Sequence, residues 1–245
     1  RKRVYHIRQY EKRLGRPIAI LGDLQGPKIR IGVFKNTYTT LKNNQKFILD
    51  LNPKEGDQNR VFLPHKEIFK SVKKNNKILI DDGKIVLNID KVLSDQIITE
   101  VLVGGKISNK KGVNIPETFI RMSSLTKKDI RDLKFCLDLS LDYIALSFVQ
   151  KAKDLNDLKK FVGNQTGIMA KFEKPMAIKN MNEILQYCDA AMVARGDLGV
   201  EMPPEEVPII QKKIVQSCRD FGIPVVVATQ MLDSMIESPS PTRAE

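Results

Sequence analysis

Two short motifs carry the side chains of this chain that are best suited to chemistry. KFEKP occupies residues 171–175 and ARGDLG occupies residues 194–199, and each motif begins at the end of an apolar run. Because residues i and i+2 of a strand point the same way, Lys171 and Glu173 share a face. Carboxylates at two neighbouring strand ends, from Glu173 and Asp197, with a lysine beside one of them, suit a Mg²⁺ ion that is held against an anionic substrate.

The segments around these motifs alternate between apolar strands and helices. Strands are expected at 18–21, 143–146, 168–170, 190–194 and 224–228. Helices are expected at 1–14, closed by Gly15, then from a start at residues 126–129 with Thr126 as N-cap, and at 153–162, 176–187 and 204–221. Continuous apolar strands of this kind indicate a parallel sheet that is covered on both faces. Polar residues follow strand after strand, namely Asp23, Ser147, Lys171 with Glu173, Asp197 and Thr229. In a (β/α) barrel the active site lies at that end of the strands.

Residues 28–115 have a different texture, with short alternating runs that are broken by Gly, Asn and Pro. This pattern predicts a small β domain with a short helix near 65–72 and strands at 29–34, 46–50, 77–80, 84–92 and 97–103. The fold class expected from the sequence is therefore α/β, a partial (β/α)8 TIM barrel with an inserted small β-barrel domain. The barrel parts are expected at 1–27 and 116–245, and the insert at 28–115.

The ends of the chain favour an internal fragment of a longer protein. The chain begins at Arg1 without a methionine, and Thr242 with Glu245 forms the capping box of a starting helix. The strands are also fewer than the eight that a closed barrel needs. We expect a chain that is cut at both ends and that is inactive by itself.

Composition narrows the range of partners. The net charge is +12, but the basic residues are scattered and only 6% of residues are aromatic. This favours a solvated basic surface with a few phosphate-binding lysines over nucleic-acid binding. The three cysteines and two histidines include no CxxC pair, which argues against a zinc site or a disulfide framework. The cysteine pattern fits a reducing compartment, and no apolar run approaches membrane-spanning length.

Several blocks that occur in order along the whole chain resemble the pyruvate kinase family. They are DLQGPKIR at 23–30, KKGVNIP at 110–116, IMAKFEK at 168–174, MVARGDLGVE at 192–201, and ATQML at 228–232 with PTRAE at 241–245. The resemblance implies a barrel A domain, a β-rich B domain that acts as a lid, and an absent C-terminal domain. It also implies a cytoplasmic homotetramer that transfers a phosphoryl group between phosphoenolpyruvate and ADP, giving pyruvate and ATP in glycolysis.

The resemblance also implies roles for the residues that match its motifs. Glu173 and Asp197 would hold Mg²⁺ or Mn²⁺, and Lys171 would stabilise the phosphoryl group in transfer. The backbone N–H groups of Gly196 and Asp197 would receive the substrate carboxylate. Thr229 would help to arrange protonation of the enolate.

Further matches concern the phosphates and the nucleotide. Arg30 would contact the transferring phosphate or the nucleotide, and Ser147 would lie near the phosphate. Asp82 and Lys111 would close over ADP, although Asp82 belongs to an Asp-Asp-Gly sequence that equally suits a plain hairpin turn.

Lys28 stands where many family members carry a glutamate and need K⁺ near Asp23 and the carbonyl of Leu24. A lysine here resembles the members that work without K⁺, because an ammonium supplies the same positive charge locally. The sequence therefore predicts K⁺-independent activity.

Two other functions are compatible with these residues. One is a different Mg²⁺-dependent phosphoenolpyruvate or pyruvate barrel enzyme, such as an aldolase or lyase, which would share the paired acids but not the insert or the Lys28 block. The other is a non-catalytic basic binding module, which would not need Glu173 or Asp197.

Overall fold

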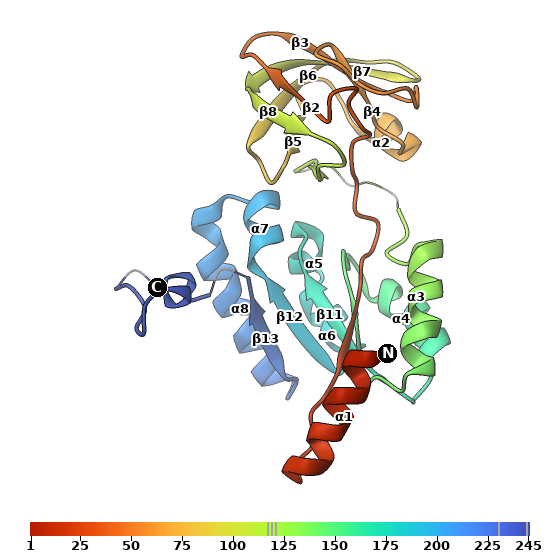
Figure 1. Ribbon diagram of the computed structural model, residues 1–245, viewed down its shortest axis with the longest axis vertical. Helices are drawn as coiled ribbons and strands as arrows, with labels where there is room; N and C mark the ends of the chain where they lie inside the picture. Colours follow the sequence, from red (N-terminus) through yellow and green to blue (C-terminus); the bar gives the residue numbers. More distant parts are fainter. Residues whose placement is uncertain (117, 119, 121, 230, 244) are drawn as a thin grey trace. The chain divides into compact units, whose positions relative to one another are not determined.

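The computed structural model describes residues 1–116, 118, 120, 122–229, 231–243 and 245 (Figure 1). The chain divides into two compact units. Unit 1 contains residues 1–27, 123–198 and 205–245, and unit 2 contains residues 28–122 and 199–204. Gln230 and Ala244, which fall within the family-like blocks at 228–232 and 241–245, lie outside the described residues.

Unit 1 is built on a five-stranded parallel sheet in the order β1-β10-β11-β12-β13. Its strands are β1 (Leu21–Leu24), β10 (Tyr143–Leu146), β11 (Gly167–Phe172), β12 (Ala190–Ala194) and β13 (Val225–Ala228). Because consecutive strands are neighbours and all of them are parallel, their carboxyl ends lie along one edge. The α/β fold class with a partial barrel that the sequence predicted is confirmed.

Helices lie before, between and after these strands along the chain (Figure 1). They are α1 (Lys2–Leu14), α3 (Lys127–Asp138), α4 (Ala152–Val162), α5 (Pro175–Lys179), α6 (Met181–Leu185), α7 (Arg195–Glu201) and α8 (Val207–Asp220), with 3-10 turns η1 (Pro204–Glu206) and η2 (Asp233–Ile236). Helix α4 buries Ala152, Leu155, Leu158 and Val162, a spacing that forms one apolar stripe. It packs on β11, and α8 packs on β12 and β13.

Two predicted helix ends are confirmed. Helix α1 ends at Gly15, whose φ of 63° is left-handed and costs glycine little. Helix α3 begins after Thr126 with a full capping box, in which Thr126 and Asp129 exchange hydrogen bonds. The single helix expected at 176–187 is instead two short helices, α5 and α6, which meet at Asn180.

Unit 2 contains a six-stranded mixed sheet in the order β4-β3-β7-β6-β5-β9 and a two-stranded sheet of β2 and β8. Its elements are β2 (Tyr38–Leu41), β3 (Lys46–Asp50), β4 (Arg60–Phe62), α2 (Lys66–Ser71), β5 (Lys77–Ile80), β6 (Ile85–Val92), β7 (Gln96–Val103), β8 (Gly105–Ser108) and β9 (Val113–Asn114). Alternate residues of β5, β6 and β7 are fully buried, which is the pattern of a sheet curled around one apolar core.

Two expected strands are wrong, and backbone hydrogen bonding explains both errors. Residues 29–34 form only isolated bridges, because their backbone groups are shared between the segment 109–113, Phe62 and Gly56. The strand expected at 18–21 begins only at Leu21. The N–H groups of Ile18 and Ile20 are instead bound by the carboxylates of Glu11 and Asp142.

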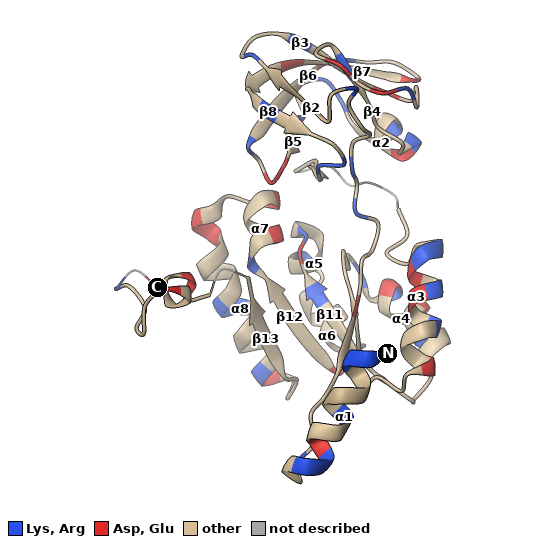
Figure 2. Cartoon of the chain, in the orientation of Figure 1, with Lys and Arg blue, Asp and Glu red and all other residues tan. Residues whose placement is uncertain are grey.

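Charged residues lie on helices and strands of both units, and Asp and Glu are interspersed among Lys and Arg (Figure 2). Among the described residues, no helix is long and apolar enough to cross a membrane. The three cysteines, Cys136, Cys188 and Cys218, are free thiols.

Candidate functional site

The ammonium group of Lys171 joins three strand ends of unit 1. Its Nζ donates to both carboxylate oxygens of Asp23 at 3.2 Å and to Oγ of Ser147 at 2.9 Å. It also forms an ion pair with Oε1 of Glu173 at 3.0 Å. An ammonium has three N–H donors, so these partners use its full capacity.

The register of the parallel sheet explains why these residues meet. Asp23 of β1 lies beside Ala145 of β10, and Ala145 lies beside Met169 of β11. Ser147 and Lys171 are each two residues beyond these partners, on the same face of their strands. The side chain of Lys171 is long enough to reach both neighbouring strands from that position. The carboxyl edge of the sheet therefore gathers residues that are far apart in sequence.

The carboxylate of Glu173 is almost completely buried, with 1% of the residue exposed. Burial raises the pKa of Glu173, the charge of Lys171 opposes that rise, and the nearby charge of Asp197 adds to it. Burial alone would lower the pKa of Lys171, but Glu173 and Asp23 outweigh it and raise the pKa. The lysine therefore stays charged, beside a carboxylate whose negative charge is opposed by burial and by Asp197.

The next two strand ends bring Gly196, Asp197 and Thr229 to the same edge. Gly196 and Asp197 lie in the first turn of α7, directly after β12, and Thr229 follows β13. A Cβ atom placed on Gly196 would lie 2.8 Å from Cγ2 of Thr229, so the threonine methyl packs over the glycine. Thr229 has a φ of 75°, which is rare for a β-branched residue.

The donor set at this edge fits a hard divalent cation. Asp23, Glu173 and Asp197 carry three formal negative charges against the one positive charge of Lys171, and their donor atoms are all oxygen. Among the described residues, no group of three or more His, Cys, Asp or Glu side chains is gathered closely enough to enclose a metal ion. Mg²⁺ does not need such a cage, because it is commonly held by one or two carboxylates together with water and substrate oxygens.

The other predicted site residues belong to unit 2. The guanidinium of Arg30 donates to the carbonyl of Lys110 at 2.9 Å. Lys111 pairs with Asp81 at 2.9 Å, and this hydrogen bond helps to lower the pKa of Asp81. Asp82 has a φ of 56°, within the hairpin that joins β5 and β6. The sequence prediction named Asp82 but did not include its neighbour Asp81, which is the partner of Lys111.

Lys28 also lies in unit 2, whereas Asp23 and Leu24 lie in unit 1. Its stem passes close to Gly112, where an added Cβ would lie 3.8 Å from Cε of Lys28. Leu24 is the last residue of β1, and its side chain is buried.

Sequence reasoning missed Phe148, which contacts this site, and Asp129, which holds the segment that follows β1. The backbone N–H of Phe148 donates to Oε2 of Glu173 at 2.8 Å. Phe148 has a φ of 57°, and a sequence gives no signal for such a conformation at a residue other than Gly, Asn or Asp. Asp129 is fully buried and binds the N–H of Gly26 at 3.1 Å. Its position in a capping box was visible in the sequence, but its second contact was not.

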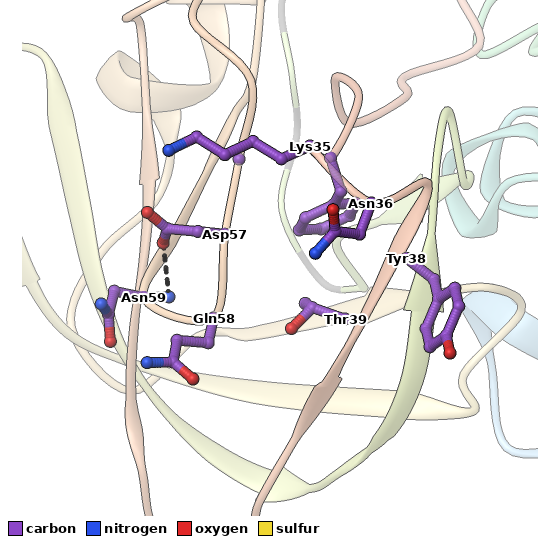
Figure 3. A pocket seen from close by; sticks show the side chains of 9 residues that line it. Lys35, Asn36, Tyr38, Thr39, Asp57, Gln58 and Asn59 are labelled. Carbon is purple, nitrogen blue, oxygen red and sulfur yellow. Dashed lines mark hydrogen bonds between the residues drawn. The ribbon is translucent and has the colours of Figure 1, made fainter.

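Unit 2 also contains a pocket of about 270 Å³ (Figure 3). Its lining is Phe34, Lys35, Asn36, Tyr38, Thr39, Gly56, Asp57, Gln58 and Asn59. The carboxylate of Asp57 is already bound by the N–H groups of Asn59 and Arg60. None of the predicted site residues lines this pocket, so it has no part in the chemistry considered for the sheet edge.

Comparison with known proteins gives a consistent result along the whole chain. The family model described as pyruvate kinase, barrel domain, matches residues 1–245. A pyruvate kinase of Methylorubrum extorquens is 50% identical over 244 residues, which cover 100% of this chain and 51% of that protein. A pyruvate kinase of Agrobacterium vitis is 50% identical over 242 residues, covering 98% of this chain and 51% of the relative.

A more distant relative agrees with these two. A pyruvate kinase of Corynebacterium glutamicum is 45% identical over 242 residues, covering 98% of this chain and 51% of that protein. The chain thus spans about half the length of the curated relatives that it matches.

The contact between Gly196 and Thr229 leads to a first prediction. Gly196→Ala would place a methyl group 2.8 Å from Cγ2 of Thr229 and should lower the free energy of unfolding by about 1–3 kcal/mol through overpacking. Thr229→Ser removes Cγ2, so the double variant should recover most of that loss. Denaturant unfolding of the full-length protein measures both effects, with Thr229→Ser alone as the control. Equal losses in the single Gly196→Ala variant and the double variant would show that this contact is not the cause.

Proposed function

The chain belongs to the pyruvate kinase family, and on that premise we propose that the protein containing it transfers a phosphoryl group between phosphoenolpyruvate and ADP, giving pyruvate and ATP. The observation that carries the proposal is the set of side chains around Lys171, with an ammonium and excess carboxylates at one edge of a parallel sheet. Phosphoryl transfer depends on positioning and on neutralising charge, and this set offers both.

We assign the metal to Glu173 and Asp197, with Mg²⁺ or Mn²⁺ as the ion. Burial raises the pKa of Glu173, and the charge of Asp197 adds to that rise. This supports the assignment, because a cation beside the two carboxylates would offset both effects. When bound, the ion supplies positive charge to the phosphoryl oxygens.

Lys171 holds its ammonium beside the metal ligands, where it would stabilise the negative charge of the phosphoryl group in transfer. Its hydrogen bonds to Asp23 and Ser147 fix the position of Nζ before a substrate arrives. Ser147 would exchange part of that contact for a phosphate oxygen. The side chain is therefore pre-organised, and little reorganisation is needed during the reaction.

The remaining roles in binding and protonation are proposed for the residues that match the family's motifs in the sequence. The N–H groups of Gly196 and Asp197 would bind the substrate carboxylate, since the first N–H groups of a helix have no partner within the helix. Thr229 would arrange protonation of the enolate. Residues 28–115 would act as the lid, in which Arg30, Asp82 and Lys111 contact the phosphates and the nucleotide.

We further propose that the complete protein is a cytoplasmic homotetramer and that this chain alone is inactive. Strands β1 and β13 each have one partner in the sheet, so both edges of the barrel fragment lack a neighbouring strand among the described residues. Open edges of this kind favour association with other chains over a rigid active site.

The metal assignment predicts the effect of one isosteric substitution. Glu173→Gln removes a negative charge from the site but keeps the shape of the side chain, and should reduce pyruvate formation by the full-length enzyme at least about a hundredfold. The measurement is a coupled assay that consumes pyruvate, with the exposed Glu183→Gln as the matched control. A Glu173→Gln enzyme as fast as the control would exclude the metal site, and a wild type that makes no pyruvate would exclude the reaction.

Lys28 predicts independence from K⁺. In buffer without Na⁺ and K⁺, the full-length enzyme should be active, and added K⁺ should change its rate little. Lys28→Glu should become dependent on K⁺, because the local positive charge is then lost. Lys35→Glu makes the same charge change elsewhere in unit 2 and is the control. A large stimulation of the wild type by K⁺ would contradict the prediction.

A further inference from the structure

Phe148 adopts a backbone conformation that its side chain does not favour. Its φ of 57° lies in the left-handed region, where bulky residues are rare. The residue follows Ser147 directly at the carboxyl end of β10. Such strain persists only when the surrounding structure holds it, and it is concentrated at functional sites.

Hydrogen bonds hold the Phe148 backbone on both sides. Its N–H donates to Oε2 of Glu173 at 2.8 Å, and its carbonyl accepts from Oγ of Ser124 at 3.1 Å. Ser124 is itself buried, with 2% of the residue exposed. Because Oε1 of Glu173 is bound by Lys171, each oxygen of this carboxylate has its own donor, and its plane is fixed.

Gly26 provides the space that this conformation of Phe148 needs. A Cβ atom on Gly26 would lie 2.8 Å from Cδ2 of Phe148 and 3.2 Å from Cβ of Ser147. The N–H of Gly26 is bound by Oδ1 of Asp129, whose Oδ2 caps helix α3 through Thr126. The start of α3 thus holds Gly26, and Gly26 in turn limits where the Phe148 ring can lie.

We propose that Phe148 is a positioning residue for Glu173, and that Gly26 and Asp129 keep it in place. The inference rests on the proposed function, because it takes Glu173 as a metal ligand. A fixed donor on Oε2 sets the direction in which the carboxylate presents its remaining lone pairs to a cation. Partners of this kind typically change metal affinity tenfold to a hundredfold when they are lost.

The test compares two glycines that have the same backbone conformation. Gly26 and Gly222 both have a φ of +67°, but an added Cβ at Gly222 has no atom within 4 Å. The variants Gly26→Ala and Gly222→Ala therefore share the backbone strain, and only Gly26→Ala displaces the Phe148 ring. The readout is Mn²⁺ affinity of the full-length protein without substrate, measured from the electron paramagnetic resonance signal of free Mn²⁺.

We expect Gly26→Ala to weaken Mn²⁺ binding about tenfold or more, and Gly222→Ala to bind like the wild type. Adding Phe148→Ala to Gly26→Ala removes the ring but keeps the N–H donor, so the double variant should recover much of the affinity. A purely structural role for Gly26 predicts no such recovery. Equal affinity in Gly26→Ala and Gly222→Ala would overturn the proposal, as would a double variant no better than Gly26→Ala alone.

Two more variants keep the result interpretable. If Gly26→Ala does not fold, Ser124→Ala takes its place, because it removes the hydrogen bond to the Phe148 carbonyl without adding an atom. It should weaken Mn²⁺ binding severalfold, and wild-type affinity would overturn the proposal.

Glu173→Gln separates this inference from the proposed function. If Glu173→Gln leaves the affinity unchanged, the metal site itself is wrong and the inference falls with it. If only the Glu173→Gln change weakens binding, the positioning role alone is wrong.

Discussion

The ammonium of Lys171 is placed among carboxylates at a site where water reaches it poorly. Only 12% of its side chain is exposed, and its partners Asp23, Ser147 and Glu173 come from three successive strand ends. One positive charge links three segments that are far apart in sequence. Asp197 adds a further negative charge near Glu173, so three carboxylates lie around this one ammonium. This grouping of carboxylates is the physical reason for expecting a divalent cation.

The parallel sheet is what makes this set of contacts achievable. Parallel neighbours bring every carboxyl end to the same edge, so short polar segments after β1, β10, β11, β12 and β13 meet without long loops. Two residues at this edge, Phe148 and Thr229, have left-handed backbones, which the close packing of Gly26 and Gly196 accommodates. These strained backbone conformations occur at the end of a sheet whose inner strands, β10, β11 and β12, are largely buried.

The sequence was most informative where the chemistry required particular residue types. Apolar strands followed by Asp23, Lys171 and Glu173 predicted the sheet and the polar side chains at its carboxyl edge, and Thr126 with Asp129 predicted the start of α3. Prediction from the sequence failed where backbone hydrogen bonds determine whether a segment forms a strand or which group it contacts. Residues 29–34 have the alternation of a strand, but their backbone bonds to the segment 109–113, to Phe62 and to Gly56. The role of the Phe148 N–H could not be predicted either, since every residue but proline has that group and only its direction matters.

The central claim is that a divalent cation is held by Glu173 and Asp197, beside an ammonium that is already in place. Anomalous diffraction from crystals of the full-length protein soaked in Mn²⁺ tests it most directly. The account predicts an anomalous peak within bonding distance of carboxylate oxygens of both residues, with Nζ of Lys171 still bound to Asp23 and Ser147. A peak elsewhere, or no peak at this edge at saturating Mn²⁺, would contradict it.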